Sequence, residues 1–302
     1  MTNPATDLVV GVDGSASALT AVRWAAVFAG QRRRGLRLVH AMDEQRLRYP
    51  RTAPAREHLH EMARARGRRV LEVARQVAED AAPNVDIRLE LRREAPMPAL
   101  QVESRTAGLL VVGRAGLRPL ARVLLGSVSV ALAAHAACAV AVVRPHIAED
   151  EPPADGPVVV GADGSPDSED ALAFAFEEAA WRKAPLVAVH CWDDGFLAAV
   201  FEQSQWKLDR AAVEQYEDEL LAQRLSGWQK RYPDVVVDRI VVRGRAAERL
   251  LDLADRAQLI VVGSRGRGTL AGALLGSTSQ TLLTYALCPV VVARGRVLPQ
   301  RR

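Results

Sequence analysis

Two glycine-rich segments carry the residues of this sequence best suited to chemistry. Both have the spacing G-x2-G-x9-G-S, from Gly113 to Ser127 and from Gly263 to Ser277. Each follows an apolar run, LLVVG or LIVVG, that predicts a buried strand, and each precedes a predicted helix. Glycine lets backbone N–H groups approach an anion and permits positive φ, and the helix N-terminus adds its positive dipole end. The spacing therefore predicts two phosphate-binding loops.

The residues exclude two better-known phosphate loops. A Walker loop needs G-x4-G-K-[ST], and no lysine follows the glycines of either loop. A Rossmann fingerprint needs G-x-G-x-x-G after the first strand, but that strand ends Gly11-Val-Asp13-Gly-Ser15, with a carboxylate where pyrophosphate would approach. Asp13 and its counterpart Asp163 therefore suit ribose hydroxyls or a Mg²⁺ ion held through phosphate. An Asp-Gly turn without a ligand is the alternative.

Polar side chains in and after the loops offer further groups to a phosphate. Ser127 and Ser129, like Ser277 and Ser279, place hydroxyl donors on the first turn of the predicted helix. Arginines in the loops either neutralise phosphate charge or are solvated surface groups. These arginines are Arg114, Arg118, Arg122, Arg265 and Arg267.

The chain consists of two copies of one unit. Identical residues recur at a constant offset of 150 positions, as in Asp13 and Asp163 or His40 and His190, and 12 of the 21 residues 109–129 match their counterparts. A constant offset leaves almost no net insertion, so we expect two domains with the same fold. The predicted organisation is a first domain over 1–147, an acidic, proline-containing linker over 148–157, a second domain over 158–294 and a tail over 295–302.

Strand and helix signals alternate within each copy. Apolar runs predict strands over 8–12, 36–41, 85–91, 109–112 and 140–143, and over 158–160, 186–189, 235–242, 259–262 and 290–292. Helices are predicted in the first copy over 17–30, 56–82, 99–106 and 127–136. Strands alternating with helices predict a parallel sheet with helices on both faces. The predicted fold class is α/β, with two tandem doubly wound five-stranded sheets.

The last predicted strand of each copy is apolar and is expected at a sheet edge. An uncovered apolar edge favours pairing with another strand. Pairing of 140–143 with 290–292 inside one chain would give a pseudo-two-fold unit, and a further homodimer is compatible with the sequence.

Composition limits the partners of the protein. The 302 residues carry a net charge of +4 and contain no apolar run of about 18 residues, so no membrane segment is expected. The N-terminus lacks the pattern of a secretion signal, which predicts a cytoplasmic location. Arginine is dense from Arg32 to Arg105 but alternates with glutamate, which favours a solvated face over a nucleic-acid surface. The cysteines, Cys138, Cys191 and Cys288, are expected to be buried apolar side chains, with a redox sensor as the alternative.

The strands ending in V-D-G-S or A-D-G-S, the G-x2-G-x9-G-S loops and the C-P-V-V-V segment of the second copy resemble the universal stress protein family. The resemblance covers both copies and implies that family's α/β nucleotide-binding sandwich, of the adenine nucleotide α-hydrolase-like type, with ATP as the ligand. It implies a first site formed by Asp13, Ala41, Gly113, Arg114, Gly116, Gly126, Ser127, Val128 and Ser129. It implies a second site formed by Asp163, Trp192, Gly263, Ser264, Gly266, Gly276, Ser277, Thr278 and Ser279.

The resemblance also implies a position for the adenine, and two residues of the first copy differ from the family pattern. Ala41 and Trp192, placed just past the second strand of each copy, lie where family members hold the adenine. The first copy departs from the pattern at Ala139, where the second has Pro289, and at Glu94, where the second has a glycine. Both departures lie outside the phosphate loop, so they concern the shape of the first domain and not its ligand.

Three classes of function remain open from the sequence. The first is an ATP-binding regulator of stress or dormancy, the second is a non-binding stress protein that acts as a scaffold, and the third is an enzyme of adenylate or pyrophosphate chemistry. Hydrolysis needs a base that holds water in line with the γ-phosphate. Asp13 and Asp163 are the only repeated carboxylates near the loops and suit sugar or metal better, so slow ATP hydrolysis is the most that we expect.

Overall fold

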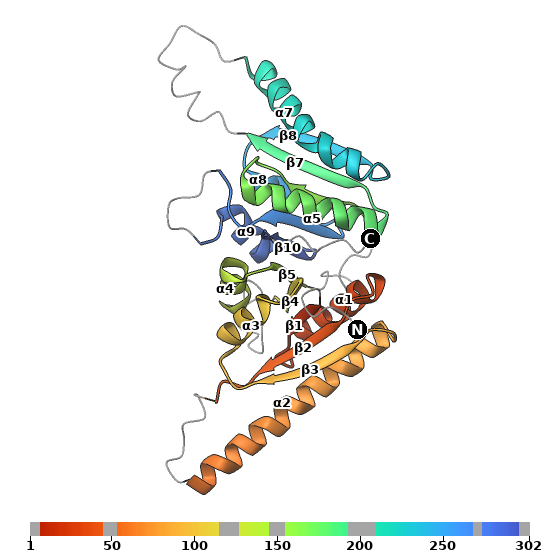
Figure 1. Cartoon of the computed structure of the whole chain (residues 1–302). Coiled ribbons are helices and arrows are strands. Elements are labelled where there is room, and N and C mark those ends of the chain that lie inside the picture. The colour runs from red at the N-terminus through yellow and green to blue at the C-terminus, as the bar shows by residue number, and fades with distance from the viewer. Residues whose placement is uncertain are drawn as a thin grey trace, which may run out of the picture. The chain divides into compact units, whose positions relative to one another are not determined.

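The structure is a computed structural model that describes residues 7–44, 53–114, 127–144, 155–192, 209–267 and 274–295. It divides into two compact units, Met1–Pro152 with Arg294–Arg302, and Pro153–Ala293 (Figure 1). Most of the predicted linker, 148–157, and of the predicted tail, 295–302, lies outside the described residues. Each unit is an α/β domain built from the same sequence of elements.

The first unit is built on five parallel strands in the order β3-β2-β1-β4-β5. Their bounds are β1 (Leu8–Gly11), β2 (Leu36–Ala41), β3 (Ile87–Arg92), β4 (Leu109–Gly113) and β5 (Ala139–Val143). The chain winds outward from β1 to β3 and then resumes on the other side of β1, so the sheet is doubly wound with its switch point between β1 and β4. The α/β fold class predicted from the sequence is confirmed.

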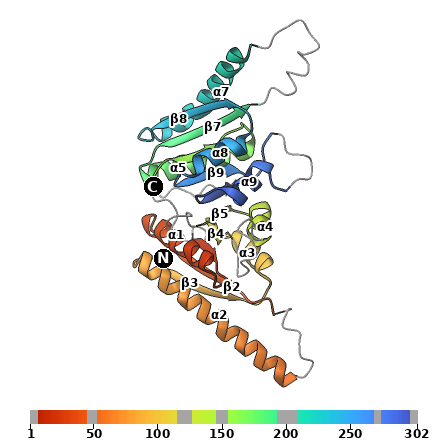
Figure 2. The ribbon, with the colours of Figure 1, turned by 180° about the vertical axis from the view of Figure 1, so that it is seen from behind.

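Among the described residues, four helices cover the two faces of this sheet (Figures 1 and 2). Their bounds are α1 (Ala16–Gln31), α2 (Ala53–Ala81), α3 (Pro96–Ser104) and α4 (Ser127–His135). Helices α1 and α2 pack against each other on one face, and α3 and α4 pack against each other on the other. Fully buried Ala21, Ala25 and Ala29 let α1 lie close to the sheet.

The second unit repeats the arrangement, with five parallel strands in the order β10-β9-β6-β7-β8. Its strands are β6 (Val158–Gly161), β7 (Leu186–Trp192), β8 (Val237–Arg243), β9 (Leu259–Gly263) and β10 (Val290–Ala293). Its helices are α5 (Pro166–Arg182), α7 (Arg210–Arg231), α8 (Ala246–Ala254) and α9 (Ser277–Tyr285). Phe176 of α5 stacks on Trp228 and Tyr232, with ring centroids 6.0 and 5.9 Å apart, and so joins α5 to the end of α7.

The second strand of the second unit extends further than the sequence predicts at its carboxyl end, whereas that of the first unit has the predicted bounds. Strand β7 continues three residues beyond the predicted 189, because Cys191 and Trp192 stay in register with Val242 and Arg243 of β8. Ala41 pairs with Arg92 in the same way. Ala41 and Trp192 are therefore the last residues of their strands, and the expectation that they follow the strands is wrong.

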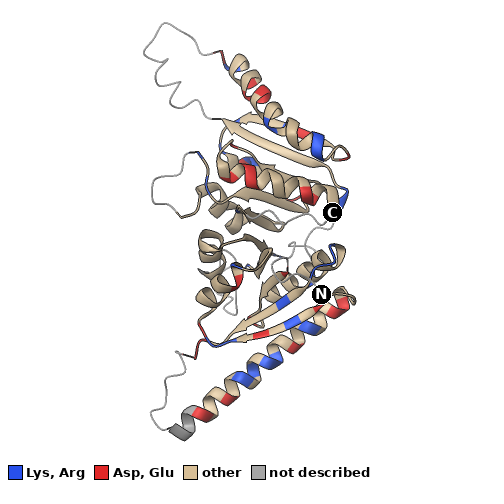
Figure 3. Ribbon diagram, in the orientation of Figure 1, with Lys and Arg blue, Asp and Glu red and all other residues tan. Residues whose placement is uncertain are grey.

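Helix α2 carries charges of both signs along its length (Figure 3). Arg75 forms ion pairs with Glu72 and with Glu79, the latter at 3.7 Å. Neighbouring charges of opposite sign offset one another, which agrees with the predicted solvated face. Among the described helices, none combines the length and the apolar character that crossing a membrane requires.

Candidate functional site

Each unit makes a tight turn between its first strand and its first helix. The N–H groups of Ser15 and Ser165 donate to Oδ1 of Asp13 and Asp163, both at 2.9 Å. Each serine Oγ then accepts the N–H three residues further on, at 3.2 Å, and so caps α1 or α5. The intervening glycine has a φ of +85° in the first unit and +75° in the second. The D-G-S motif thus forms the Asp-Gly turn that was the alternative reading of these aspartates.

A cavity opens at the carboxyl ends of the strands in each unit, at the switch point of the sheet. Its volume is about 240 Å³ in the first unit and about 690 Å³ in the second. Every residue that lines the first cavity, except Ser15, has its counterpart in the lining of the second. The repeat in the sequence is therefore also a repeat of the cavity.

Most of the predicted site residues line these cavities. In the first unit these are Asp13, Ala41, Gly113, Val128 and Ser129. In the second they are Asp163, Trp192, Gly263, Gly266, Gly276, Ser277, Thr278 and Ser279. Gly116, Gly126 and the side chain of Ser127 lie outside the described residues. Arg114 and Ser264 are described but are not among the lining residues.

The described loop glycines do not adopt the positive φ that glycine permits. These are Gly113, Gly263, Gly266 and Gly276. In the described part of the chain, the glycines with positive φ are Gly14, Gly156, Gly164 and Gly244. None of them belongs to the loops. Gly276 has a φ of −67° and precedes the first turn of α9. The conformational freedom of glycine is therefore not used at the four loop positions, and the absence of a side chain is the property that matters there.

Close packing of backbone explains two of these glycines. A Cβ atom at Gly113 would lie 2.6 Å from the carbonyl oxygen of Ser17, and one at Gly263 would lie 2.7 Å from that of Asp167. The ends of β4 and β9 therefore pass directly against the first turns of α1 and α5. Glycine is needed there for contact between strand and helix, whatever the ligand.

The second serine of each helix start tethers the helix to the preceding strand. Ser129 Oγ donates to the carbonyl oxygen of Gly113 at 3.0 Å, and Ser279 Oγ donates to that of Gly263 at 2.7 Å. A hydroxyl has one hydrogen to donate. The predicted donation from Ser129 and Ser279 to phosphate would therefore require each hydroxyl to leave its carbonyl.

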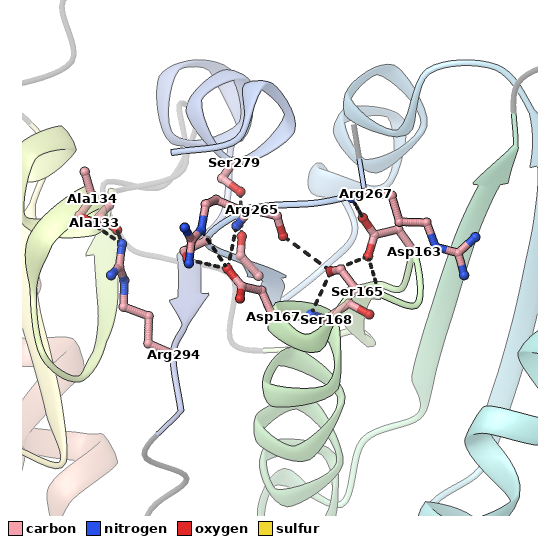
Figure 4. A network of polar contacts seen from close by, with 12 residues as sticks. Ala133, Ala134, Asp163, Ser165, Asp167, Ser168, Arg265, Arg267, Ser279 and Arg294 are labelled. Atoms are coloured by element: carbon pink, nitrogen blue, oxygen red, sulfur yellow. Dashed lines mark hydrogen bonds and ion pairs between the residues drawn. The ribbon is translucent and has the colours of Figure 1, made fainter. Parts of the chain in front are cut away.

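Asp163 holds the loop of the second unit to the turn after β6 (Figure 4). Its Oδ1 accepts the hydroxyl of Ser165 at 2.7 Å, and its Oδ2 accepts the N–H of Arg267 at 2.9 Å. Burial alone would raise the pKa of Asp163, but the hydrogen bonds from Ser165 and the amide and charge of Arg267 outweigh burial and lower it. The carboxylate is thus ionised at neutral pH and fixes the start of the loop.

Asp167, on the first turn of α5, holds the same loop from a second direction. Its Oδ2 accepts the hydroxyl of Ser264 at 2.6 Å and the N–H of Arg265 at 3.0 Å. The sequence analysis did not include Asp167. The available signal was a difference between the copies, because its counterpart in the first unit is Ser17.

A histidine–glutamate pair borders the second cavity and was also missed. His190 Nδ1 lies 2.6 Å from the carbonyl oxygen of Ala162, which can only accept, and Nε2 lies 3.0 Å from Oε2 of Glu217. The carbonyl oxygen needs a donor, so Nδ1–H donates to it and Nε2 faces the carboxylate. In the first unit Gly67 occupies the position that matches Glu217. That difference between the copies was again the available signal.

Two further features define what the cavities can hold. Trp192 Nε1 is buried and has no hydrogen-bond partner among the described residues, although its ring borders the second cavity. Within the described ranges, no group of three or more His, Cys, Asp or Glu side chains could hold a metal ion by itself. The indole N–H of Trp192 is thus unpaired among the described residues, and a ligand would have to reach this buried atom to accept its hydrogen bond.

Comparison with known proteins identifies the family of the chain. A sequence model of the universal stress protein family matches residues 5–144 and 156–294. The chain belongs to the universal stress protein family. Among relatives, universal stress proteins Rv2005c and Rv2623 of Mycobacterium tuberculosis are 42% and 39% identical, over 95% and 97% of this chain and 96% and 97% of their own lengths. The crystal structure of a universal stress protein from Archaeoglobus fulgidus has a TM-score of 0.69 and 19% identity, covering 97% of this chain and 99% of its own.

The family match applies to both units of this universal stress protein. Each unit has its own match, and each has its own cavity at the same place in the fold. The structural similarity to the archaeal protein supports the tandem fold, and its low identity carries nothing about the ligand.

Proposed function

We propose that this universal stress protein binds ATP, one molecule in each unit, and acts as a nucleotide-dependent regulator of the stress response or of growth arrest. The observation that carries the proposal is the pair of cavities with matched linings, each beside a glycine loop and a helix N-terminus. Phosphate suits a helix N-terminus because the first N–H groups of a helix have no partner within it.

The size of the second cavity and the groups that line it support this proposal. The cavity volume of about 690 Å³ lies in the range of small-molecule pockets. The indole N–H of Trp192 would donate to a ring nitrogen of adenine, and the backbone N–H groups of Ser277 and Thr278 would face phosphate. Asp163 would contact the ribose or a Mg²⁺ ion carried by the phosphates, as Asp13 would in the first unit.

We expect at most slow hydrolysis at these sites. Asp163 already accepts hydrogen bonds from Ser165 and Arg267, and Glu217 is held by His190. Neither carboxylate is therefore free to take a proton from water in line with a γ-phosphate. Occupancy, and not turnover, would then carry the signal, through different affinities of ATP for two states of the protein. The same proposal includes a cytoplasmic location.

Equilibrium dialysis of the purified full chain with ATP tests the proposal. The double variant Gly126→Glu with Gly276→Glu places a carboxylate at both helix starts and should abolish binding. Gly276 has no atom other than its own neighbours within 3.5 Å of an added Cβ, so the second unit should still fold. Gly227→Glu is the matched control, because that glycine lies on α7 with open space around an added Cβ.

The proposal expects about two ATP per chain in the wild type and in Gly227→Glu, and none in the double variant. Wild type without ATP binding would overturn it and leave the scaffold function. Retained binding in the double variant would show that the sites are elsewhere. Turnover well above about 1 per second would indicate an enzyme instead.

A further inference from the structure

A protein carboxylate occupies donors of the glycine loop in the second unit. Oδ2 of Asp167 accepts the Ser264 hydroxyl at 2.6 Å and the Arg265 N–H at 3.0 Å, and it lies 3.5 Å from Nε of Arg265 (Figure 4). Two hydrogen bonds and one ion pair from two successive loop residues thus meet at one carboxylate oxygen. A carboxylate and a phosphate oxygen accept the same donors, and Arg265 lines the cavity, so Asp167 holds donors at the border of the site where an anionic ligand would be recognised.

The surroundings of this contact favour its formation. Ser264 is buried, and the Asp167 side chain is 25% exposed, so the carboxylate is partly shielded from water. Asp167 also offsets the charge of Arg265, a residue that borders the cavity and could otherwise attract phosphate. Asp167 therefore already pairs two hydrogen-bond donors and part of the positive charge of the loop.

The first unit has no carboxylate at the matched position. Ser17 stands there, and its Oγ is buried without a hydrogen-bond partner among the described residues. The backbone at the two positions serves the same contact, because the carbonyl groups of Ser17 and Asp167 pack against Gly113 and Gly263. The two units thus differ at this point by a negative charge.

We propose that Asp167 is an internal competitor of the ligand's phosphates, which lowers the affinity of the second site for ATP and makes that site discriminate by phosphate number. The inference rests on the proposed ATP binding and adds a specificity-determining residue to it. Phosphate must either displace Asp167 from Ser264 and Arg265 or bind beside it against like charge. Both effects grow with the charge of the ligand.

The test isolates the second site in the full chain and removes the charge in two ways. In a Gly126→Glu background, Asp167→Ser introduces the residue of the first unit, and Asp167→Asn keeps the shape of the side chain. Calorimetric titrations with AMP, ADP and ATP, each with and without Mg²⁺, give the dissociation constants. Both variants are expected to bind ATP about tenfold more tightly than the parent, which is a typical size for coupling between two groups. The gain should shrink for ADP and nearly vanish for AMP.

Two controls separate competition from a general effect. Glu169→Gln removes a charge from the same turn of α5 but none of the loop contacts described above, so it should change ATP affinity by less than about twofold. Ser17→Asp, measured in a Gly276→Glu background, should weaken ATP binding at the first site by about tenfold. Thermal melts of each variant confirm that it is folded.

The outcomes distinguish this inference from the proposed function. If the parent binds ATP and Asp167→Ser or Asp167→Asn binds it equally or less tightly, the inference is overturned while ATP binding stands. An equal gain for AMP and ATP also overturns it, since that indicates a structural effect. If the second site binds ATP only after Asp167 is replaced, the inference holds, because Asp167 then prevents binding altogether. If no variant binds ATP at either site, both proposals fall.

Discussion

Replacing Gly263 by alanine tests whether a loop glycine serves the fold. The added Cβ would lie 2.7 Å from the carbonyl oxygen of Asp167 and 2.8 Å from its carbonyl carbon. Backbone atoms cannot rotate away as a side chain does, so β9 and the first turn of α5 would have to separate by about 0.7 Å to reach an ordinary contact of 3.4 Å. Overpacking of this kind costs about 1–3 kcal/mol of unfolding free energy.

Gly276→Ala is the matched comparison within the same loop. Its φ of −67° suits alanine, and the nearest atom to the added Cβ is 3.5 Å away. Alanine is a poorer N-cap than glycine, but it also lowers the entropy of the unfolded chain, so the net change should stay within about 0.5 kcal/mol.

Differential scanning calorimetry of the full chain measures both variants. For a unit of this size, each kcal/mol shifts the melting temperature by roughly 3 °C, so Gly263→Ala should lower the transition of the second unit by about 3–9 °C. Gly276→Ala should leave it nearly unchanged. Equal melting temperatures for the two variants would refute the assignment of Gly263 to packing.

Three further predictions concern single side chains. Asp7 is fully buried, and burial raises the pKa of its carboxyl above the usual 3.8 against the opposing charges of Arg88 and Arg37. The folded state therefore loses stability as pH rises through that raised pKa. At neutral pH, Asp7→Asn should have a free energy of unfolding roughly 1 kcal/mol above that of wild type. The difference should vanish below about pH 4, and circular dichroism melts over this pH range measure it. Trp192→Phe keeps an aromatic ring but removes the unpaired indole N–H, so equilibrium dialysis should show about three- to tenfold weaker ATP binding at the second site, and unchanged affinity would exclude the indole as a donor. Ser279→Ala removes the 2.7 Å hydrogen bond to the carbonyl oxygen of Gly263 and should lower the free energy of unfolding, measured with denaturant, by about 1 kcal/mol. The loss of ATP-binding free energy should exceed this value only if the hydroxyl moves to phosphate when ATP binds.

The arrangement of strands and helices was largely predictable from the sequence. Strand β2 has the predicted bounds, and α2 ends one residue before the predicted end because Pro83 lies just beyond. Apolar runs such as LLVVG have few alternatives to a buried strand. The extra length of β7 was not predictable, because it depends on pairing with β8, which lies far away in the sequence.

The internal contacts of the site were less accessible to sequence reasoning. The motif located Asp163 and Ser279, but not the groups with which their side chains bond. Asp167 contacts residues nearly a hundred positions away, and Glu217 reaches His190 from another helix. Spacing along the chain identifies positions that the fold brings together, but it does not say which donor each acceptor takes.

The exchange of Ser17 for Asp167 has a consequence for how a duplicated protein can diverge. Two identical chains in a dimer must carry the same residue at both sites, whereas a fused duplicate can change one half and keep the other. With a negative charge in one loop alone, the two sites would fill at different concentrations of nucleotide. One polypeptide could then report partial and full saturation as separate states, with no second gene product required.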